Sequence, residues 1–410
     1  MQYTYVGVDS HKDAHTAVFL DCFFGRLGQI TFDNLPSKFS AFLIDAEKYR
    51  VDQTSLLFGL EDTSDYGRNL MMFLKDNGQT VKHVNSLLVA RERKNQSITQ
   101  KTDSYDAECA ARVLLSKFDV LPDVQTQDKY WALRTLVTRR NFIITNNMSL
   151  KNQLHSLLTH HYPGYQRFFK NIQGNTSLAF FMKYPSPGLL KGVTVEELAD
   201  FFYKPSQGKI GEAKAKMILE SIEHTSVEFQ EVRDNAVQSA IRQIRFNLTE
   251  LEKIDQYIAE LLAKFNCTLT SMTGIEVTTA ADLLSLIGDI RRFSSPAKLA
   301  RYAGIAPVTY ASGKKESKFA NQRGNRELNS VLYQLAIRVS MIAGPNHKVI
   351  NPIFYEYYKR KQTEGKTKRQ ALKCVQRRLV NVIWGMLTND REYINPPMFN
   401  LPKEGLTTKK

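Results

Sequence analysis

Residues 3–12 read YTYVGVDSHK, an apolar run that is rich in aromatic and β-branched side chains and leads into Asp9. Such a composition favours a buried β-strand. A carboxylate at the end of a buried strand costs desolvation free energy unless another group balances its charge. The stretch therefore predicts a strand over residues 3–8 that brings Asp9 to a charged partner.

Strand-like and helix-like segments alternate around this run through the first third of the chain. Expected strands cover residues 16–20, 29–32, 56–60 and 80–84, and a turn is expected at residues 25–28. Expected helices cover residues 39–49, 68–77, 86–93 and 103–117. The pattern predicts an antiparallel meander that opens an α/β domain.

Three further acids lie at the ends of expected elements. Glu61 ends the strand 56–60, and Asp103 and Asp106 stand three residues apart on one face of a helix start. Hard Mg²⁺ prefers carboxylate oxygens, and these four acids could hold two ions roughly 3.5–4 Å apart for phosphodiester chemistry. An acid at a helix start also serves as an N-cap or complements the helix dipole, so spacing alone leaves both interpretations open for Asp103. His11 is near Asp9 and could support that ligand without binding the ion itself. No histidine has a metal-ligand spacing, however, and a structural or surface role is favoured for each.

Two long helical patterns characterise the middle of the chain. Apolar residues recur every seven residues from Leu136 to Leu157, and a second stripe runs from Ile241 to Leu261 at three- and four-residue spacing. The pair predicts an antiparallel hairpin or an oligomerisation coiled coil, with plain core packing as the alternative. Between them, residues 162–208 concentrate proline and glycine and are expected to form an irregular insertion.

Composition bounds the class of protein. The 410 residues suggest two or three domains at roughly 150 residues each. Hydrophobic residues make up 42% and charged residues 24%, which is typical of a globular chain. No apolar run approaches the ~18 residues of a membrane span, and the N-terminus lacks the pattern of a secretory signal. The four cysteines form no CxxC pair, which argues against a zinc site or a disulfide framework and favours the cytosol.

Basic side chains exceed acidic ones, with 56 Lys and Arg against 41 Asp and Glu and a net charge of +15. Residues 289–330 hold nine Lys or Arg against three acids, and residues 359–378 hold nine against Glu364 alone. Such an excess usually meets a polyanion, of which nucleic acid is the commonest. A basic surface kept for solubility is the alternative.

One serine stands in this basic region. Ser312 lies in an expected loop and is followed by Gly313, Lys314 and Lys315. Glycine lets a backbone approach a ligand closely, and lysines hold phosphate. Because a serine hydroxyl is a weak nucleophile unless a base or a metal activates it, Ser312 by itself is interpreted as a phosphate contact or an ordinary loop residue.

Short motifs follow one another along nearly the whole chain. They are residues 5–12 (YVGVDSHK), 61–67 (EDTSDYG), 101–107 (KTDSYDA), 274–293, 302–307 (YAGIAP), 312–314 (SGK) and 323–326 (RGNR). Together they resemble the DEDD transposases of IS110-type insertion sequences, relatives of the Piv DNA invertase. Ala311 stands where many relatives carry a first serine, which leaves Ser312 as the only serine of its motif.

The resemblance implies a fold and a site. It implies an RNase H-like (RuvC-like) α/β domain at residues 1–128, a helical coiled-coil region with the insertion at 129–268, and a mostly helical transposase domain at 269–410 with a helix-hairpin-helix-like element. It also implies a composite site in which Ser312 attacks DNA, forms a phosphoserine link and frees a 3′-OH. The residues implied to bind Mg²⁺, as a two-metal site, are Asp9, Glu61, Asp103 and Asp106.

The resemblance also implies partners and a setting. Donor and target DNA, a structured guide RNA encoded beside the gene, and further copies of the chain in a dimer or tetramer are expected, with no membrane. The protein would act in the prokaryotic cytoplasm, at the nucleoid. The basic residues expected to contact nucleic acid are Lys101, Arg291, Arg292, Lys314, Lys315, Arg323 and Arg326.

Two other functions stay open on the sequence. The first is a RuvC-like, structure-selective nuclease in which metal-activated water cuts DNA and Ser312 only contacts phosphate. The second is a nucleic-acid-binding scaffold that has lost catalysis, against which the presence of all four acids counts. A covalent protein–DNA link requires the serine, whereas hydrolysis does not.

Overall fold

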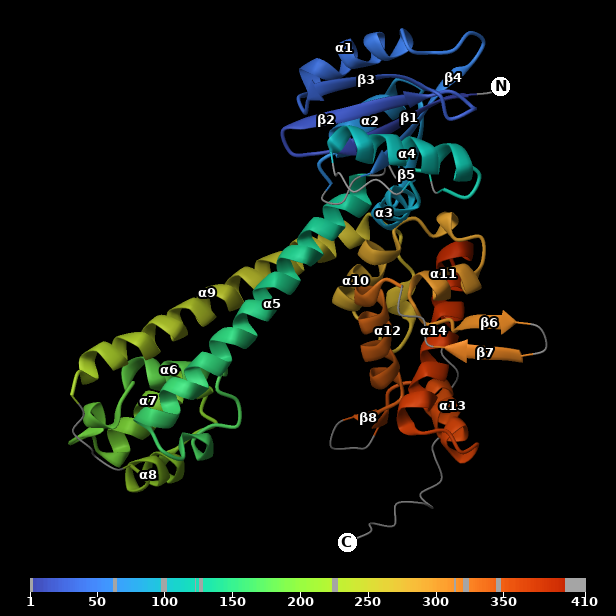
Figure 1. Ribbon diagram of the computed structural model, residues 1–410. Helices are drawn as coiled ribbons and strands as arrows, with labels where there is room; N and C mark the ends of the chain where they lie inside the picture. Colours follow the sequence, from blue (N-terminus) through green and yellow to red (C-terminus); the bar gives the residue numbers. More distant parts are fainter. Residues whose placement is uncertain are drawn as a thin grey trace. The chain divides into compact units, whose positions relative to one another are not determined.

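A computed structural model describes residues 3–61, 65–96, 102–121, 123–124, 128–222, 228–312, 315–319, 324–343 and 348–394. Of residues 128, 308–312, 315–319, 343 and 348 it describes the backbone alone. The chain forms two compact units, which Figure 1 colours along the sequence. The first contains Met1–Asp128 and Gly288–Ser294, and the second contains Lys129–Ile287 and Ser295–Lys410.

The first unit is a mixed α/β structure built on one sheet (Figure 1). Its elements are β1 (Tyr3–Ser10), β2 (Ala14–Leu20), β3 (Arg26–Asp33), α1 (Pro36–Glu47), β4 (Ser55–Glu61), α2 (Arg68–Asp76), β5 (Thr80–Val84), α3 (Ser86–Asn95), α4 (Asp103–Lys117) and the short 3-10 helix η4 (Ile290–Arg292). The predicted order of strands and helices is confirmed. The turn predicted at residues 25–28 is wrong, because the Asp21 side chain accepts hydrogen bonds from the Phe23 and Gly25 N–H groups and closes the turn earlier.

The five strands lie in the order β3-β2-β1-β4-β5. β1 pairs antiparallel with β2, and β2 pairs antiparallel with β3, so the predicted meander is confirmed. β4 is parallel to β1, and β5 is parallel to β4. Because parallel strands run in one direction, β1 and β4 end at the same edge of the sheet.

Helices cover both faces of this sheet. Side chains alternate between the faces along a strand, and the two sets pack against different helices. Val6 and Phe58 lie in the core cluster that includes residues of α1 and α2. Tyr5 and Leu57 lie in the cluster that includes residues of α3 and α4.

Two glycines let α4 lie very close to the sheet. Gly7 on β1 is in register with Gly59 on β4. A Cβ atom at Gly7 would lie 2.1 Å from the Ala107 carbonyl oxygen and 2.2 Å from the Ala111 nitrogen. The backbone of α4 therefore rests directly on β1, and this contact fixes where the helix begins relative to the ends of the strands.

The second unit is helical apart from two short hairpins. Its elements are α5 (Asp128–His161), η1 (Tyr165–Arg167), α6 (Asn175–Lys183), η2 (Pro187–Leu190), α7 (Val195–Ser206), α8 (Glu212–Glu220), α9 (Gln230–Ala263), η3 (Leu269–Ser271), α10 (Val277–Ile287), α11 (Pro296–Tyr302), β6 (Val308–Ser312), β7 (Lys315–Phe319), α12 (Arg326–Val339), β8 (Ile342–Ala343), β9 (Lys348–Val349), α13 (Pro352–Thr363) and α14 (Lys368–Asn389).

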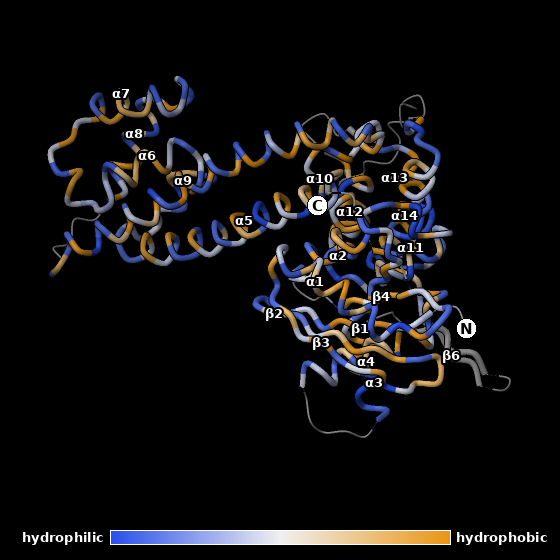
Figure 2. Tube along the Cα trace, turned by 90° about the horizontal axis from the view of Figure 1, so that it is seen from above, coloured by the Kyte–Doolittle hydropathy of each residue, from blue (hydrophilic) through white to orange (hydrophobic). Residues whose placement is uncertain are grey.

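The long helices α5 and α9 run side by side in opposite directions (Figures 1 and 2). The Arg140 Nε atom lies 2.5 Å from Asp255 Oδ1, and Asn247 Nδ2 donates to Asn147 Oδ1 at 2.8 Å. Of the two predicted arrangements, the structure shows the antiparallel hairpin within one chain. Among the described residues, no helix combines the length and the apolar character needed to cross a membrane.

The insertion predicted to be irregular is helical. The segment after α5 forms α6, α7 and α8, which gather at one end of the α5–α9 pair (Figure 2). Its core contains Phe168, Phe180, Phe181 and Phe202. The prediction was wrong for two reasons. The prolines fit the helices, because Pro187 lies in the first turn of η2 and Pro205 in the last turn of α7. Burial of the aromatic side chains also stabilises short helices that helix propensity alone would not.

Candidate active site

Two of the predicted acids end neighbouring parallel strands. Asp9 on β1 is paired in register with Glu61 on β4. Tyr5 and Leu57, four residues earlier on the same strands, face α3 and α4, so Asp9 and Glu61 face the same side of the sheet. Asp9 is 8% exposed, and Glu61 is half-buried. Both carboxyl groups therefore stand at one edge of the sheet, on the side that α4 covers.

The first turn of α4 carries the other two acids. Thr102 caps this helix, because its Oγ1 accepts a hydrogen bond from the Tyr105 N–H at 3.2 Å. This settles the N-cap alternative for Asp103, which lies one residue inside the helix. Asp103 is exposed and Asp106 is buried, and the helix dipole stabilises negative charge at both positions.

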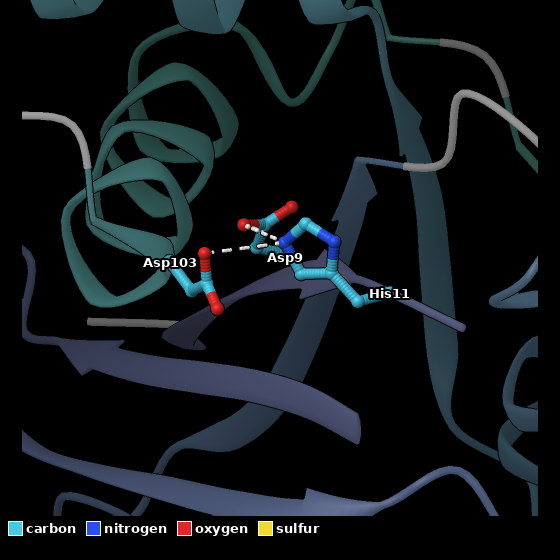
Figure 3. Close-up of side chains that lie close together, drawn as sticks. All are labelled: Asp9, His11 and Asp103. Atoms are coloured by element: carbon cyan, nitrogen blue, oxygen red, sulfur yellow. Dashed lines mark hydrogen bonds and ion pairs between the residues drawn. The ribbon is translucent and has the colours of Figure 1, made fainter. Parts of the chain in front are cut away.

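A histidine joins the acids of β1 and α4. The His11 Nε2 atom lies 3.0 Å from Asp9 Oδ2 and 3.3 Å from Asp103 Oδ1, and Figure 3 shows the imidazole in contact with both carboxylates. One ligand atom from each of these three residues lies within 4.8 Å of the others. Their spacing is suited to a metal ion.

The electrostatics of Asp9 fit a cation at this position. Burial raises the pKa of the Asp9 carboxyl, His11 offsets part of that rise through its charge and hydrogen bond, and the charges of Asp106 and Asp103 add to it. A divalent cation among these groups would favour the ionised carboxylates. Their hard oxygens match the ligand preference of Mg²⁺ and Mn²⁺.

Asp106 has a counter-ion on the neighbouring helix. The Arg93 Nη1 atom on α3 forms an ion pair with Asp106 Oδ1, and both side chains are largely buried. The ligand atoms within 4.8 Å of one another come from Asp9, His11 and Asp103, and neither Glu61 nor Asp106 belongs to that group. The structure thus brings Asp9 and Asp103 together through His11 and holds Asp106 on Arg93.

An asparagine links the loop that follows β1 to Tyr66. The Asn34 Nδ2 atom donates to the carbonyl oxygens of His11, Lys12 and Tyr66, at 3.4, 3.2 and 3.1 Å. These bonds hold the loop that carries His11 near Tyr66, which lies just before α2. Sequence reasoning favoured a structural or surface role for His11 and did not single out Arg93 or Asn34, since only the fold brings these side chains to the acids.

The candidate serine lies at the end of a strand. Ser312 is the last residue of β6 and is in register with Lys315, the first residue of β7. The loop predicted at Ser312 is therefore wrong, because the pairing that begins with Val308 and Phe319 extends to the serine. Three other predicted residues lie outside the described residues, namely Lys101, Lys314 and Arg323.

The remaining predicted arginines are exposed and lie in two places. Arg291 Nε donates to Asp289 Oδ2 at 2.9 Å, and the Arg292 guanidinium lies 4.6 Å from the centre of the Phe293 ring. These residues lie in Gly288–Ser294, which belongs to the first compact unit although it follows α10 in sequence. Arg326 is the first residue of α12.

Two family models match separate parts of the chain. A DEDD model of IS110 type, described as a transposase, matches residues 6–163, and the model of the transposase IS116/IS110/IS902 family matches residues 266–359. The chain belongs to the IS110 family of transposases. It is therefore an enzyme that acts on DNA. The first match spans all four acids, and the second spans Ser312.

Curated relatives agree with this assignment. The chain is 25% identical over 397 residues to the insertion element IS116 uncharacterized 44.8 kDa protein of Streptomyces clavuligerus. The aligned region covers 96% of each chain. It is 26% identical to the insertion element IS110 uncharacterized 43.6 kDa protein of Streptomyces coelicolor, over 88% of this chain and 85% of that protein. It is 31% identical over 162 residues to the pilin gene-inverting protein of Moraxella lacunata, over 37% of this chain and 47% of that protein.

Proposed function

We propose that this transposase is an RNA-guided DNA recombinase that exchanges strands through a serine–DNA link. The observation that carries the proposal is the register of Asp9 with Glu61, together with the contact of His11 with Asp9 and Asp103. The strand order β3-β2-β1-β4-β5, with acids at the ends of β1 and β4 and in the first turn of α4, supports an RNase H-like (RuvC-like) domain.

The acids would hold two Mg²⁺ ions. Asp9 and Asp103 would bind one ion with His11 as a further ligand, and Glu61 and Asp106 would complete the pair. When bound, the metal ions activate the nucleophile and stabilise the leaving oxygen in phosphodiester chemistry. Arg93, which forms an ion pair with Asp106, would keep that side chain in place.

Ser312 would be the nucleophile. Its Oγ forms a bond to the phosphorus of one DNA strand as the hydroxyl proton leaves, the bond from phosphorus to the 3′ oxygen breaks, and that oxygen takes up a proton to become a 3′-OH. A 3′-OH from another strand then attacks the phosphoserine and releases the serine. The position of Ser312 at the end of β6, the last residue paired with β7, supports its access to a DNA backbone.

The proposal extends to partners and domains. A guide RNA would read donor and target DNA by base pairing, so the protein would contact backbones and shape. The domains would cover residues 1–128, 129–268 and 269–410, and the protein would act as a dimer or tetramer in the bacterial cytoplasm. The residues proposed to contact nucleic acid are Lys101, Arg291, Arg292, Lys314, Lys315, Arg323 and Arg326.

A structure-selective nuclease is the second candidate. The Asp9, His11 and Asp103 cluster is compatible with it as well, because a metal ion held there could activate water without any serine. Strand exchange distinguishes the two functions.

A recombination assay tests the proposed function. Purified protein is incubated with donor and target plasmids, Mg²⁺ and RNA transcribed from the sequence that flanks its gene, and new junctions are read by sequencing. Recombinant junctions that require both the RNA and Mg²⁺ are expected. Junctions formed equally without RNA would contradict RNA guidance, and cut DNA without junctions would support the nuclease.

A further inference from the structure

A basic groove lies next to the start of β6, the strand that ends at Ser312, in the second unit. Its volume is about 780 Å³, and it lies between the N-terminal parts of α12 and α14 and the segment that follows α11. We refer to it as the α12–α14 groove. The lining residues that matter here are Gly304, Pro307, Arg326, Tyr333, Arg369 and Lys373.

A tight backbone contact forms one wall of this groove. A Cβ atom at Gly324 would lie 2.1 Å from the Gly304 nitrogen, so the two segments touch through their main chains. The Asn325 N–H donates to the Tyr302 carbonyl at 2.7 Å, and Asn329 Nδ2 donates to the Ala303 carbonyl at 2.8 Å. Two motifs that are separate in sequence are therefore joined into one surface.

Uncompensated positive charge lines the groove. Arg326 occupies the first turn of α12, where Asn325 caps the helix and the dipole favours an anion. Arg369 and Lys373 stand one turn apart on α14 and so share a face. Among the described residues, no Asp or Glu lines the groove, and no carboxylate pairs with any of these three cations. Burial, and then the charge of Arg369, lower the pKa of Lys373.

The size and the other side chains indicate a polymeric anion. The groove is larger than one phosphate group requires and lies in the range of pockets that hold sizeable ligands. Tyr333 adds an aromatic ring, and Asn329 and Ser330 add neutral hydrogen-bonding groups. Surfaces that bind a nucleic-acid backbone typically combine basic side chains with aromatic rings and neutral polar groups.

The strand β6 sets the distance from the groove to the serine. Pro307 lines the groove and directly precedes β6, and Ser312 ends that strand. Five residues of extended chain span about 17 Å. That length corresponds to about five nucleotide steps of one strand of B-form DNA.

We propose that the α12–α14 groove binds the backbone of the DNA strand that Ser312 attacks, about five nucleotides from the attacked phosphate. Arg326, Arg369 and Lys373 contact the phosphates, and the joined segments at Gly304 and Gly324 hold the groove open. The inference rests on the proposed function, because it takes the strand attacked by Ser312 as its reference point.

The test compares two double variants that lose the same charge. Arg369→Ala with Lys373→Ala removes two groove cations, whereas Lys366→Ala with Lys368→Ala removes two exposed lysines that do not line the groove. Both are made in Ser312→Ala protein, so that binding is measured without chemistry, and their melting temperatures are compared first. Affinity for donor DNA is measured against salt, and ethylation interference maps the phosphates in contact.

The groove variant is expected to lower the salt slope by about 1.8, since each lost phosphate contact contributes about 0.9. Interference at phosphates about five nucleotides from the cleavage site should disappear in it and persist in the control. Equal salt slopes in the two variants would overturn the proposal. So would a groove variant that changes the salt slope for guide RNA but not for donor DNA. If the groove variant changes binding as expected but the wild-type protein exchanges no strands, only the proposed function would be refuted.

Discussion

Asp9 and Glu61 occupy directly paired positions at the ends of the parallel strands β1 and β4. Their side chains face the helix α4, whose first turn carries Asp103 and Asp106. The pairing of Gly7 with Gly59, two residues earlier on each strand, gives α4 room to approach. The acids are thus assembled by strand register and by one close helix–strand contact.

Replacing Asp9 is expected to stabilise the metal-free protein. Burial raises its pKa in the folded state above the ordinary value of 3.8, so the folded protein binds more protons than the unfolded one as pH rises past that value. The free energy of unfolding therefore falls through this window, and the loss persists at neutral pH. Asp9→Asn should raise the melting temperature in EDTA and abolish any rise on adding Mg²⁺. The exposed Asp103→Asn is the control, and an equal gain in EDTA from both variants would refute a burial effect specific to Asp9.

His11 is expected to influence which metal binds. Mg²⁺ is the harder ion and accepts a nitrogen ligand less readily than Mn²⁺ does, so His11→Ala should weaken Mn²⁺ binding about tenfold and Mg²⁺ binding less. Calorimetry gives both affinities, and pulsed electron paramagnetic resonance on bound Mn²⁺ should show a nitrogen coupling that His11→Ala loses. An unchanged nitrogen signal in the variant would rule out His11 as a ligand.

Gly7→Ala should displace α4. The added Cβ would meet backbone atoms of Ala107 and Ala111 at 2.1 and 2.2 Å, which a side-chain rotation cannot relieve. A loss of about 1–3 kcal/mol in unfolding free energy is expected, together with weaker metal binding. Gly188→Ala is the control, because nothing lies within 4 Å of its added Cβ. Equal behaviour of the two variants would show that the close contact is not needed.

Arg93→Ala should leave the buried Asp106 carboxylate without its counter-ion. We expect a cost of about 1–3 kcal/mol in metal-free protein, partly recovered when Mg²⁺ is added, since a bound cation would replace the lost charge. The exposed neighbour Arg91→Ala is the control. Chemical denaturation with and without Mg²⁺ measures both effects. If Mg²⁺ recovers nothing, Asp106 is not a metal ligand.

Much of the first unit could be predicted from the sequence, because its strands are short apolar runs between turns and α4 begins at Asp103 as expected. The register of Asp9 with Glu61 could not, since the ends of two strands do not specify which residues pair. The contact of His11 with the acids could not be predicted either, because it depends on a loop whose position Asn34 holds. The insertion misled the prediction because proline and glycine are local signals, whereas aromatic packing around Phe180 is tertiary.

The most direct measurement is a covalent-trapping assay. Protein is mixed with labelled donor and target DNA, guide RNA and Mg²⁺, denatured, and separated on a gel. A DNA-linked protein band is expected from the wild type, absent in Ser312→Ala and in EDTA. It should be retained in Ser317→Ala, the control, which replaces a serine on the paired strand β7. Cleaved DNA without a linked band, at equal yield in Ser312→Ala, would contradict the serine mechanism and establish hydrolysis in its place.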